Sequence, residues 1–87
     1  MQSNSDEDIL SRFMEAGKVV FSKWGASRRF CLKYNINYSN LKNTLNGIRT
    51  SLPITWISAM VLEFGVSAEW ILTGHGSMFS RDKIANK

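Results

Sequence analysis

The sequence predicts one all-α domain, and three observations support this prediction. Apolar residues recur at three- and four-residue spacing in five segments, as they do along one face of an α-helix. Residues that favour helix ends, mainly serine, asparagine and glycine, stand between these segments. The chain has 87 residues, of which 44% are hydrophobic and one is proline, which fits a single domain with a modest core and argues against disorder.

The first helix is predicted over about residues 6–16. Ser5 is a suitable N-cap, and the three acids that follow it favour a helix N-terminus. Gly17 is expected to end this helix. Residues 17–25 show no period that decides between helix, strand and loop. Their large apolar side chains are nevertheless expected to pack: Val19, Val20, Phe21 and Trp24.

Two short helices are predicted next, separated by about three residues. The first covers "SRRFCLKYN", and Asn35 is expected to end it because asparagine tolerates the left-handed backbone conformation. Either Asn37 or Ser39 is expected to cap the second, which runs to about Asn46 and stops at Gly47.

The apolar residues around this turn follow the helix-turn-helix pattern. Cys31 is small enough for two helices to cross closely, and Ile36 follows the turn and fills the space between them. Leu41 and Leu45 then seat the second helix. In a helix-turn-helix the second helix enters the DNA major groove.

Two further helices complete the predicted domain. Pro53 suits the first turn of a fourth helix, which Gly65 is expected to end. Ser67 is expected to cap a short fifth helix that contains Trp70 and Ile71 and ends at Gly74.

The charge distribution favours an anionic partner. No aspartate or glutamate occurs between Ala16 and Leu62, whereas seven lysines and arginines lie in the same window. One sign of charge concentrated in this way is typical of a nucleic-acid-binding surface. A solvated basic face without a partner is the alternative.

The third predicted helix is unusually rich in asparagine, and its outward positions are polar and free of acids. Asparagine offers a donor and an acceptor together, which matches the major-groove edge of adenine, and lysine suits guanine or a phosphate. The candidate base-reading residues are Asn37, Tyr38, Ser39, Asn40, Lys42, Asn43 and Asn46. The candidate phosphate-binding residues, which flank this helix or begin the one before it, are Lys23, Ser27, Arg28 and Arg49. An asparagine-rich solvent face with no function remains the alternative.

The segments "FCLKYNINYSNLKNTLNG" and "LPITWISAMVLEFGVSAEWILTGHGSMF" resemble the N-terminal DNA-binding domain of phage CI-type repressors. The resemblance covers about residues 26–79, and it departs from the common pattern at Cys31, where alanine is usual, and at Asn35, where glycine is usual. It implies a five-helix lambda-repressor-like domain with a helix-turn-helix, which binds operator DNA as a dimer and represses transcription. An antirepressor or adaptor that uses the same fold to bind protein is the alternative function.

Residues 1–79 are therefore expected to form the DNA-binding domain, and the polar segment 80–87 is expected to begin a linker. A homodimer is expected to form through about residues 70–79, with Ile71, Met78 and Phe79 as its apolar groups. We expect this dimer to be weak without DNA or a C-terminal domain.

The sequence predicts neither enzymatic activity nor a cofactor or metal site. His75 is the one histidine, and a lone histidine with the distant Cys31 does not make a usual zinc site. Glu63 and Glu69 are expected to decorate helix surfaces. A single cysteine, the absence of a signal peptide and the absence of a long apolar run predict a cytoplasmic protein without a membrane span.

Overall fold

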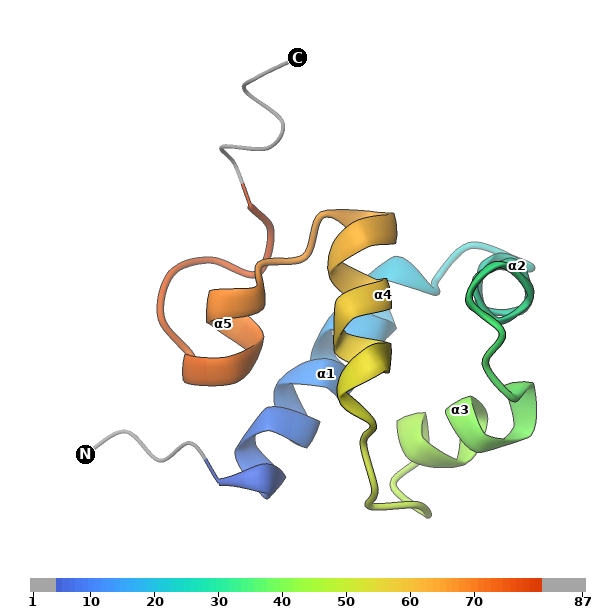
Figure 1. Ribbon diagram of the computed structural model, residues 1–87, viewed down its shortest axis with the longest axis horizontal. Coiled ribbons are helices and arrows are strands. Elements are labelled where there is room, and N and C mark those ends of the chain that lie inside the picture. Colours follow the sequence, from blue (N-terminus) through green and yellow to red (C-terminus); the bar gives the residue numbers. More distant parts are fainter. Residues whose placement is uncertain (1–4, 81–87) are drawn as a thin grey trace.

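A computed structural model describes residues 5–80, which form five α-helices and no β-strand (Figure 1). The helices are α1 (Asp6–Val20), α2 (Ala26–Tyr34), α3 (Tyr38–Leu45), α4 (Ile54–Phe64) and α5 (Ala68–Thr73). The predicted all-α class is therefore confirmed. Of the segment expected to begin a linker, residues 81–87 lie outside the described residues.

Helix α1 begins as predicted but ends later than predicted. The Asp8 N–H donates to Ser5 Oγ at 3.3 Å, and the Ser5 N–H donates to Asp8 Oδ2 at 3.4 Å, so the two residues form a capping box. The prediction that Gly17 ends the helix is wrong, because α1 continues to Val20 and Gly17 is buried within it. A Cβ at Gly17 would lie 2.7 Å from Leu45 Cδ2. The glycine therefore allows α3 to approach α1 closely.

Residues 17–25, whose apolar residues showed no clear period, contain the end of α1 and the turn that leads to α2. The Phe21 ring packs against those of Phe30 and Phe64, with centroids 5.2 and 5.5 Å away, so three aromatic rings join α1, α2 and α4. The expectation that all the large apolar groups here pack is wrong for Trp24, which is 95% exposed, and Val19 is 49% exposed.

The predicted ends of the other helices are confirmed to within one residue. Asn35 ends α2 in the left-handed conformation at φ 57°, and the Asn40 N–H donates to Asn37 Oδ1 at 2.9 Å to cap α3. Helix α4 begins directly after Pro53. The Trp70 N–H donates to Ser67 Oγ at 3.1 Å, so this serine caps α5.

The core draws at least one buried side chain from each helix: Phe13, Phe30, Leu41, Met60 and Ile71. Helix α5 packs against α1, and Arg12 Nε donates to the Ile71 carbonyl oxygen at 2.7 Å. After α5 the chain returns to the end of α4, where the Ser67 N–H donates to the Met78 carbonyl oxygen at 2.7 Å. None of the helices in residues 5–80 is long and apolar enough to cross a membrane.

Candidate functional site

Helices α2 and α3 form a compact pair joined by the three residues 35–37. The Ile36 N–H donates to the Cys31 carbonyl oxygen at 2.9 Å, which fixes the direction of the turn. Cys31 and Leu41 are both buried, at 5% and 0% exposure, and Ile36 packs partly against the same core. Burial raises the pKa of the Cys31 thiol, so the side chain stays neutral and acts as a small apolar group.

Helix α3 has one buried face and one exposed polar face. Leu41 and Thr44 are buried, and Leu45 packs against α1 beside Gly17. Six of the seven candidate base-reading residues are exposed. One of them, Asn37, caps α3, and the other five lie on the remaining surface: Ser39, Asn40, Lys42, Asn43 and Asn46. This polar face of α3, defined by those five residues, carries amide and hydroxyl groups, one positive charge and no carboxylate.

The other two candidate base-reading residues, Asn37 and Tyr38, already make side-chain contacts within the protein. The Asn37 Oδ1 oxygen caps α3, which leaves the amide NH₂ of that side chain as its outward donor. Tyr38 is half-buried, and the Arg28 guanidinium lies over its ring with Cζ 4.3 Å from the centroid. This cation–π contact holds Arg28 beside the N-terminus of α3.

Arg49 is held beside the other end of α3. Its Nη1 donates to Thr44 Oγ1 at 3.3 Å, and its Cζ lies 5.0 Å from the Trp56 ring centroid. The hydrogen bond also provides a partner for the buried Thr44 hydroxyl. Two of the four candidate phosphate-binding residues, Arg28 and Arg49, are therefore positioned at opposite ends of the polar face of α3 by aromatic rings.

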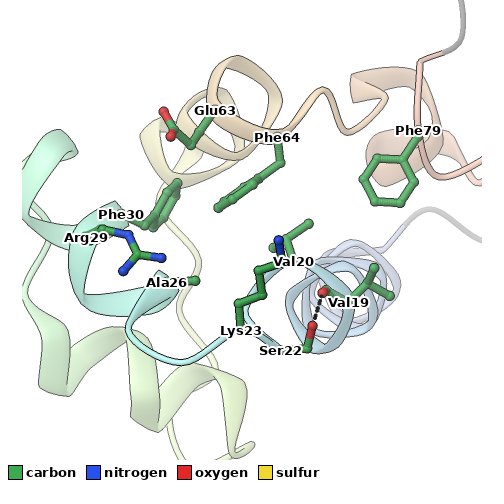
Figure 2. A pocket seen from close by; sticks show the side chains of 10 residues that line it. All are labelled: Val19, Val20, Ser22, Lys23, Ala26, Arg29, Phe30, Glu63, Phe64 and Phe79. Carbon is green, nitrogen blue, oxygen red and sulfur yellow. Dashed lines mark hydrogen bonds between the residues drawn. The ribbon is translucent and has the colours of Figure 1, made fainter. Parts of the chain in front are cut away.

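The remaining two candidates lie near the N-terminus of α2. Ser27 is half-buried in the first turn of that helix. Lys23 lines a hollow of about 410 Å³ together with residues of α1, α2, α4 and the C-terminal segment (Figure 2). No residue of α3 lines this hollow, so the structure does not bring Lys23 to the polar face of α3.

Glu63 links α4 to α2, a role that its sequence position did not reveal. Its Oε1 lies 2.9 Å from Lys33 Nζ and accepts a hydrogen bond from the Tyr34 hydroxyl at 3.0 Å. The bond to Lys33, followed by that to Tyr34, holds the pKa of Glu63 below its ordinary value, and the same contact raises the pKa of Lys33. Burial, followed by the contact with Glu63, raises the pKa of Tyr34.

Replacing Glu63 with glutamine should lower the melting temperature by a few degrees at neutral pH. Because the folded state lowers the pKa of this carboxyl, the stabilisation is present above the ordinary pKa of about 4.3 and is lost as the pH falls through the folded value. The pair is largely exposed, so solvent screens the two charges and their contribution to stability is small. Melting curves of Glu63→Gln and wild type should therefore converge in acid. Glu15→Gln makes the same change on an exposed part of α1 and should behave as wild type at each pH; a constant gap between Glu63→Gln and wild type would contradict the assignment.

The structure also places the other residues considered from the sequence. Within residues 5–80 no three histidine, cysteine, aspartate or glutamate side chains lie close enough together to hold a metal ion. His75 and Glu69 are exposed, Trp56 is buried and Trp70 is half-buried against the core.

Comparison with known proteins returned nothing: no protein family, no curated protein and no solved structure matches this chain. The assignment of the polar face of α3 and its two flanking arginines as the candidate site therefore depends on the geometry described above.

Proposed function

We propose that this chain is a sequence-specific DNA-binding repressor of phage or prophage type, with a lambda-repressor-like fold, that acts in the cytoplasm. Helices α2 and α3 are its helix-turn-helix, and α3 reads operator half-sites in the major groove. The observation that carries the proposal is the polar face of α3, on which five exposed side chains offer hydrogen bonds and no carboxylate. Such a face suits the donor and acceptor edges of base pairs.

Three asparagines dominate this face, and a bidentate amide contact favours adenine. Asn40 and Asn43 lie three residues apart, so both side chains reach the same side of the helix. Lys42, the one charged residue of the face, suits guanine or a phosphate. We assign the main base contacts to Asn40 and Asn43.

Phosphate contacts are assigned first to Arg28 and Arg49, because each guanidinium is held at one end of α3. Contacts of this kind set the register of a protein on the duplex without reading the sequence. Ser27 is retained as a further phosphate candidate at the start of α2, whereas Lys23 is not, because it lines the hollow away from α3. That helix begins after Gly25 without a side-chain cap, which suits its first N–H groups to an anion.

Selection from random duplex DNA tests the proposed function. The purified chain should enrich one near-palindromic site with half-sites about 34–36 Å apart, which is one turn of the double helix. A gel shift should then show that the selected site is bound more tightly than a scrambled duplex of the same composition. Recovery of unrelated sequences, or equal binding to both duplexes, would refute sequence-specific reading.

A two-fold dimer is part of the proposal, but the structure corrects the residues available for it. Ile71, expected to be an exposed apolar group, is 0% exposed and is the buried residue of α5. Met78 and Phe79 are half-buried against the core. Three other exposed apolar side chains, those of Ile54, Leu62 and Leu72, border a groove of about 360 Å³ between α4 and α5. It is named here the α4–α5 groove, and its lining consists of Ile54, Ile57, Ser58, Val61, Leu62, Ala68 and Leu72.

A second copy of this chain is the proposed occupant of the α4–α5 groove. The lining residues carry no charge. Two copies can therefore meet at this groove without the repulsion that would arise if their surfaces rich in lysine and arginine faced each other. Ile54 and Leu62 are 72% and 68% exposed and provide the apolar area.

Leu62→Lys should raise the dissociation constant of this dimer at least about tenfold, because a two-fold interface brings the two added charges together. Sedimentation equilibrium at micromolar concentration measures the change. Leu32→Lys adds the same charge at an exposed leucine of α2 outside the groove and should leave self-association unchanged. Equal dimerisation of Leu62→Lys and wild type would exclude the α4–α5 groove.

The alternative function is an antirepressor or adaptor that binds protein through the same helices. Protein interfaces rely on exposed apolar or aromatic anchors. Tyr38 is the one aromatic candidate on α3, and it is half-buried under Arg28. This arrangement favours DNA over protein as the partner of α3.

A further inference from the structure

The hollow that contains Lys23 has an apolar floor and lies away from α3. Val20, Phe30, Phe64 and Phe79 contribute its apolar surface (Figure 2). It is located where α4 ends, whereas α3 lies near the beginning of α4 (Figure 1). A ligand in this hollow can therefore bind independently of whatever α3 contacts.

Two cations border the hollow without a carboxylate partner among residues 5–80. Lys23 and Arg29 both line it, and neither lies within ion-pair distance of a described aspartate or glutamate. The one acid in the lining, Glu63, already faces Lys33 at 2.9 Å. The border of the hollow consequently keeps a net positive charge that suits an anionic group.

Two exposed apolar side chains add to this surface, one at the edge of the hollow and one outside it. Trp24 follows Lys23 and is 95% exposed, although the turn that carries it is ordered by a hydrogen bond from the Ala26 N–H to the Lys23 carbonyl oxygen at 3.1 Å. Val19 is 49% exposed at the edge of the hollow. Exposed tryptophan and arginine are the residues that most often dominate binding energy in protein interfaces.

The size of the surface favours a polypeptide over a small anion. Trp24 does not line the hollow, so a small molecule inside it would leave the indole in water. A peptide segment can fill the hollow with one side chain and cover the indole with its neighbours.

We propose that the surface formed by Val19, Lys23, Trp24 and Arg29 around the hollow, named here the α1–α2 surface, binds an acidic segment of a partner protein. The segment inserts an aliphatic or aromatic side chain into the hollow between Phe64 and Phe79. Its carboxylates pair with Lys23 and Arg29, and its apolar neighbours cover Trp24. This inference does not depend on DNA binding by α3.

Peptide-display selection on the full chain tests the proposal. Binders should be enriched in sequences that place aspartate or glutamate next to a large apolar residue. A synthetic peptide of the most enriched sequence should shift Trp24 emission to shorter wavelength, because Trp56 is buried and Trp70 is half-buried. Failure to enrich acidic sequences would overturn the proposal.

Two variants locate the binding site of the selected peptide. Trp24→Ala and Arg29→Ala should each weaken its binding by about thirtyfold or more, the loss typical of a truncated hot-spot residue. Leu32→Ala is the matched control, since Leu32 is 84% exposed on α2 but does not line the hollow. Circular dichroism checks that all three remain folded. Undiminished peptide binding by both variants would overturn the proposal.

A parallel experiment with DNA distinguishes the peptide partner of the α1–α2 surface from the DNA partner assigned to α3. The peptide should bind equally well with and without the selected duplex, and Trp24→Ala and Arg29→Ala should retain DNA affinity. If the two variants instead lose DNA affinity and the duplex displaces the peptide, the α1–α2 surface is a DNA contact and the proposal fails.

Discussion

Asn40→Ala and Asn43→Ala together should remove the preference for the selected DNA site while leaving the protein folded. Both side chains are exposed on the polar face of α3, and their amides have no part in the core. Each good bidentate base contact contributes about 1–3 kcal/mol of discrimination, so each single variant should lose roughly tenfold to hundredfold in affinity at one base position. Gel shifts against singly substituted sites measure both the loss and the position.

Arg28→Ala and Thr55→Ala are the controls for this result. Arg28→Ala should weaken binding to every duplex about equally and lower the slope of log affinity against log salt by about one unit. Thr55→Ala removes an exposed polar group from α4 and should change nothing. If the Asn40 and Asn43 variants retain full affinity and sequence preference, α3 is not the reading helix.

Gly17→Val should destabilise the domain by about 2 kcal/mol, which lowers the melting temperature by roughly 8–16 °C. The first added carbon would lie 2.7 Å from Leu45 Cδ2, and the two methyl groups would add to this overlap. Thermal denaturation measures the change. Lys18→Val introduces the same β-branched residue at the next, exposed position of α1 and should cost much less.

A second substitution separates overlap from helix propensity. In the Gly17→Ala background the overlap with Leu45 is smaller, and alanine favours the helix by about 1 kcal/mol. Leu45→Ala should therefore cost less in that background than in wild type, with a coupling of about 0.5–3 kcal/mol. Strict additivity would show that α1 and α3 do not meet at Gly17.

The helix ends could be predicted because the forces that set them are local. Asn35 accepts the left-handed conformation through its own side chain, and Ser67 and Asn37 each cap a helix by bonding a backbone N–H three residues ahead. Such contacts are encoded within a few neighbouring residues, so the pattern alone indicates them.

Gly17 shows where a local rule fails. Glycine near the end of an apolar pattern predicts a stop, yet here its missing side chain matters because of Leu45, which lies far along the sequence. The same limit explains Ile71 and Trp24. We expected Ile71 to be exposed and Trp24 to pack, but both outcomes depend on which neighbours the fold supplies. In the structure Ile71 is buried and Trp24 is exposed.

The polar face of α3 could also be predicted, since the period of the sequence separates its buried leucines from its outward asparagines. The aromatic rings that hold its flanking arginines in place could not be predicted. Arg49 lies over Trp56 and Arg28 over Tyr38 only after three helices have packed, and no spacing in the sequence indicates either contact.

The bond between Arg12 and the Ile71 carbonyl ties the second turn of α1 to the last turn of α5. A helix as short as α5 is unstable alone in water, so it depends on this attachment and on the burial of Ile71. The dependence is mutual, because α1 also buries its apolar side against α5. During synthesis, α1 must therefore wait for almost the whole described chain to leave the ribosome before its last packing partner arrives. We expect nascent chains that end before α5 to expose the apolar side of α1 and to attract chaperones and proteases.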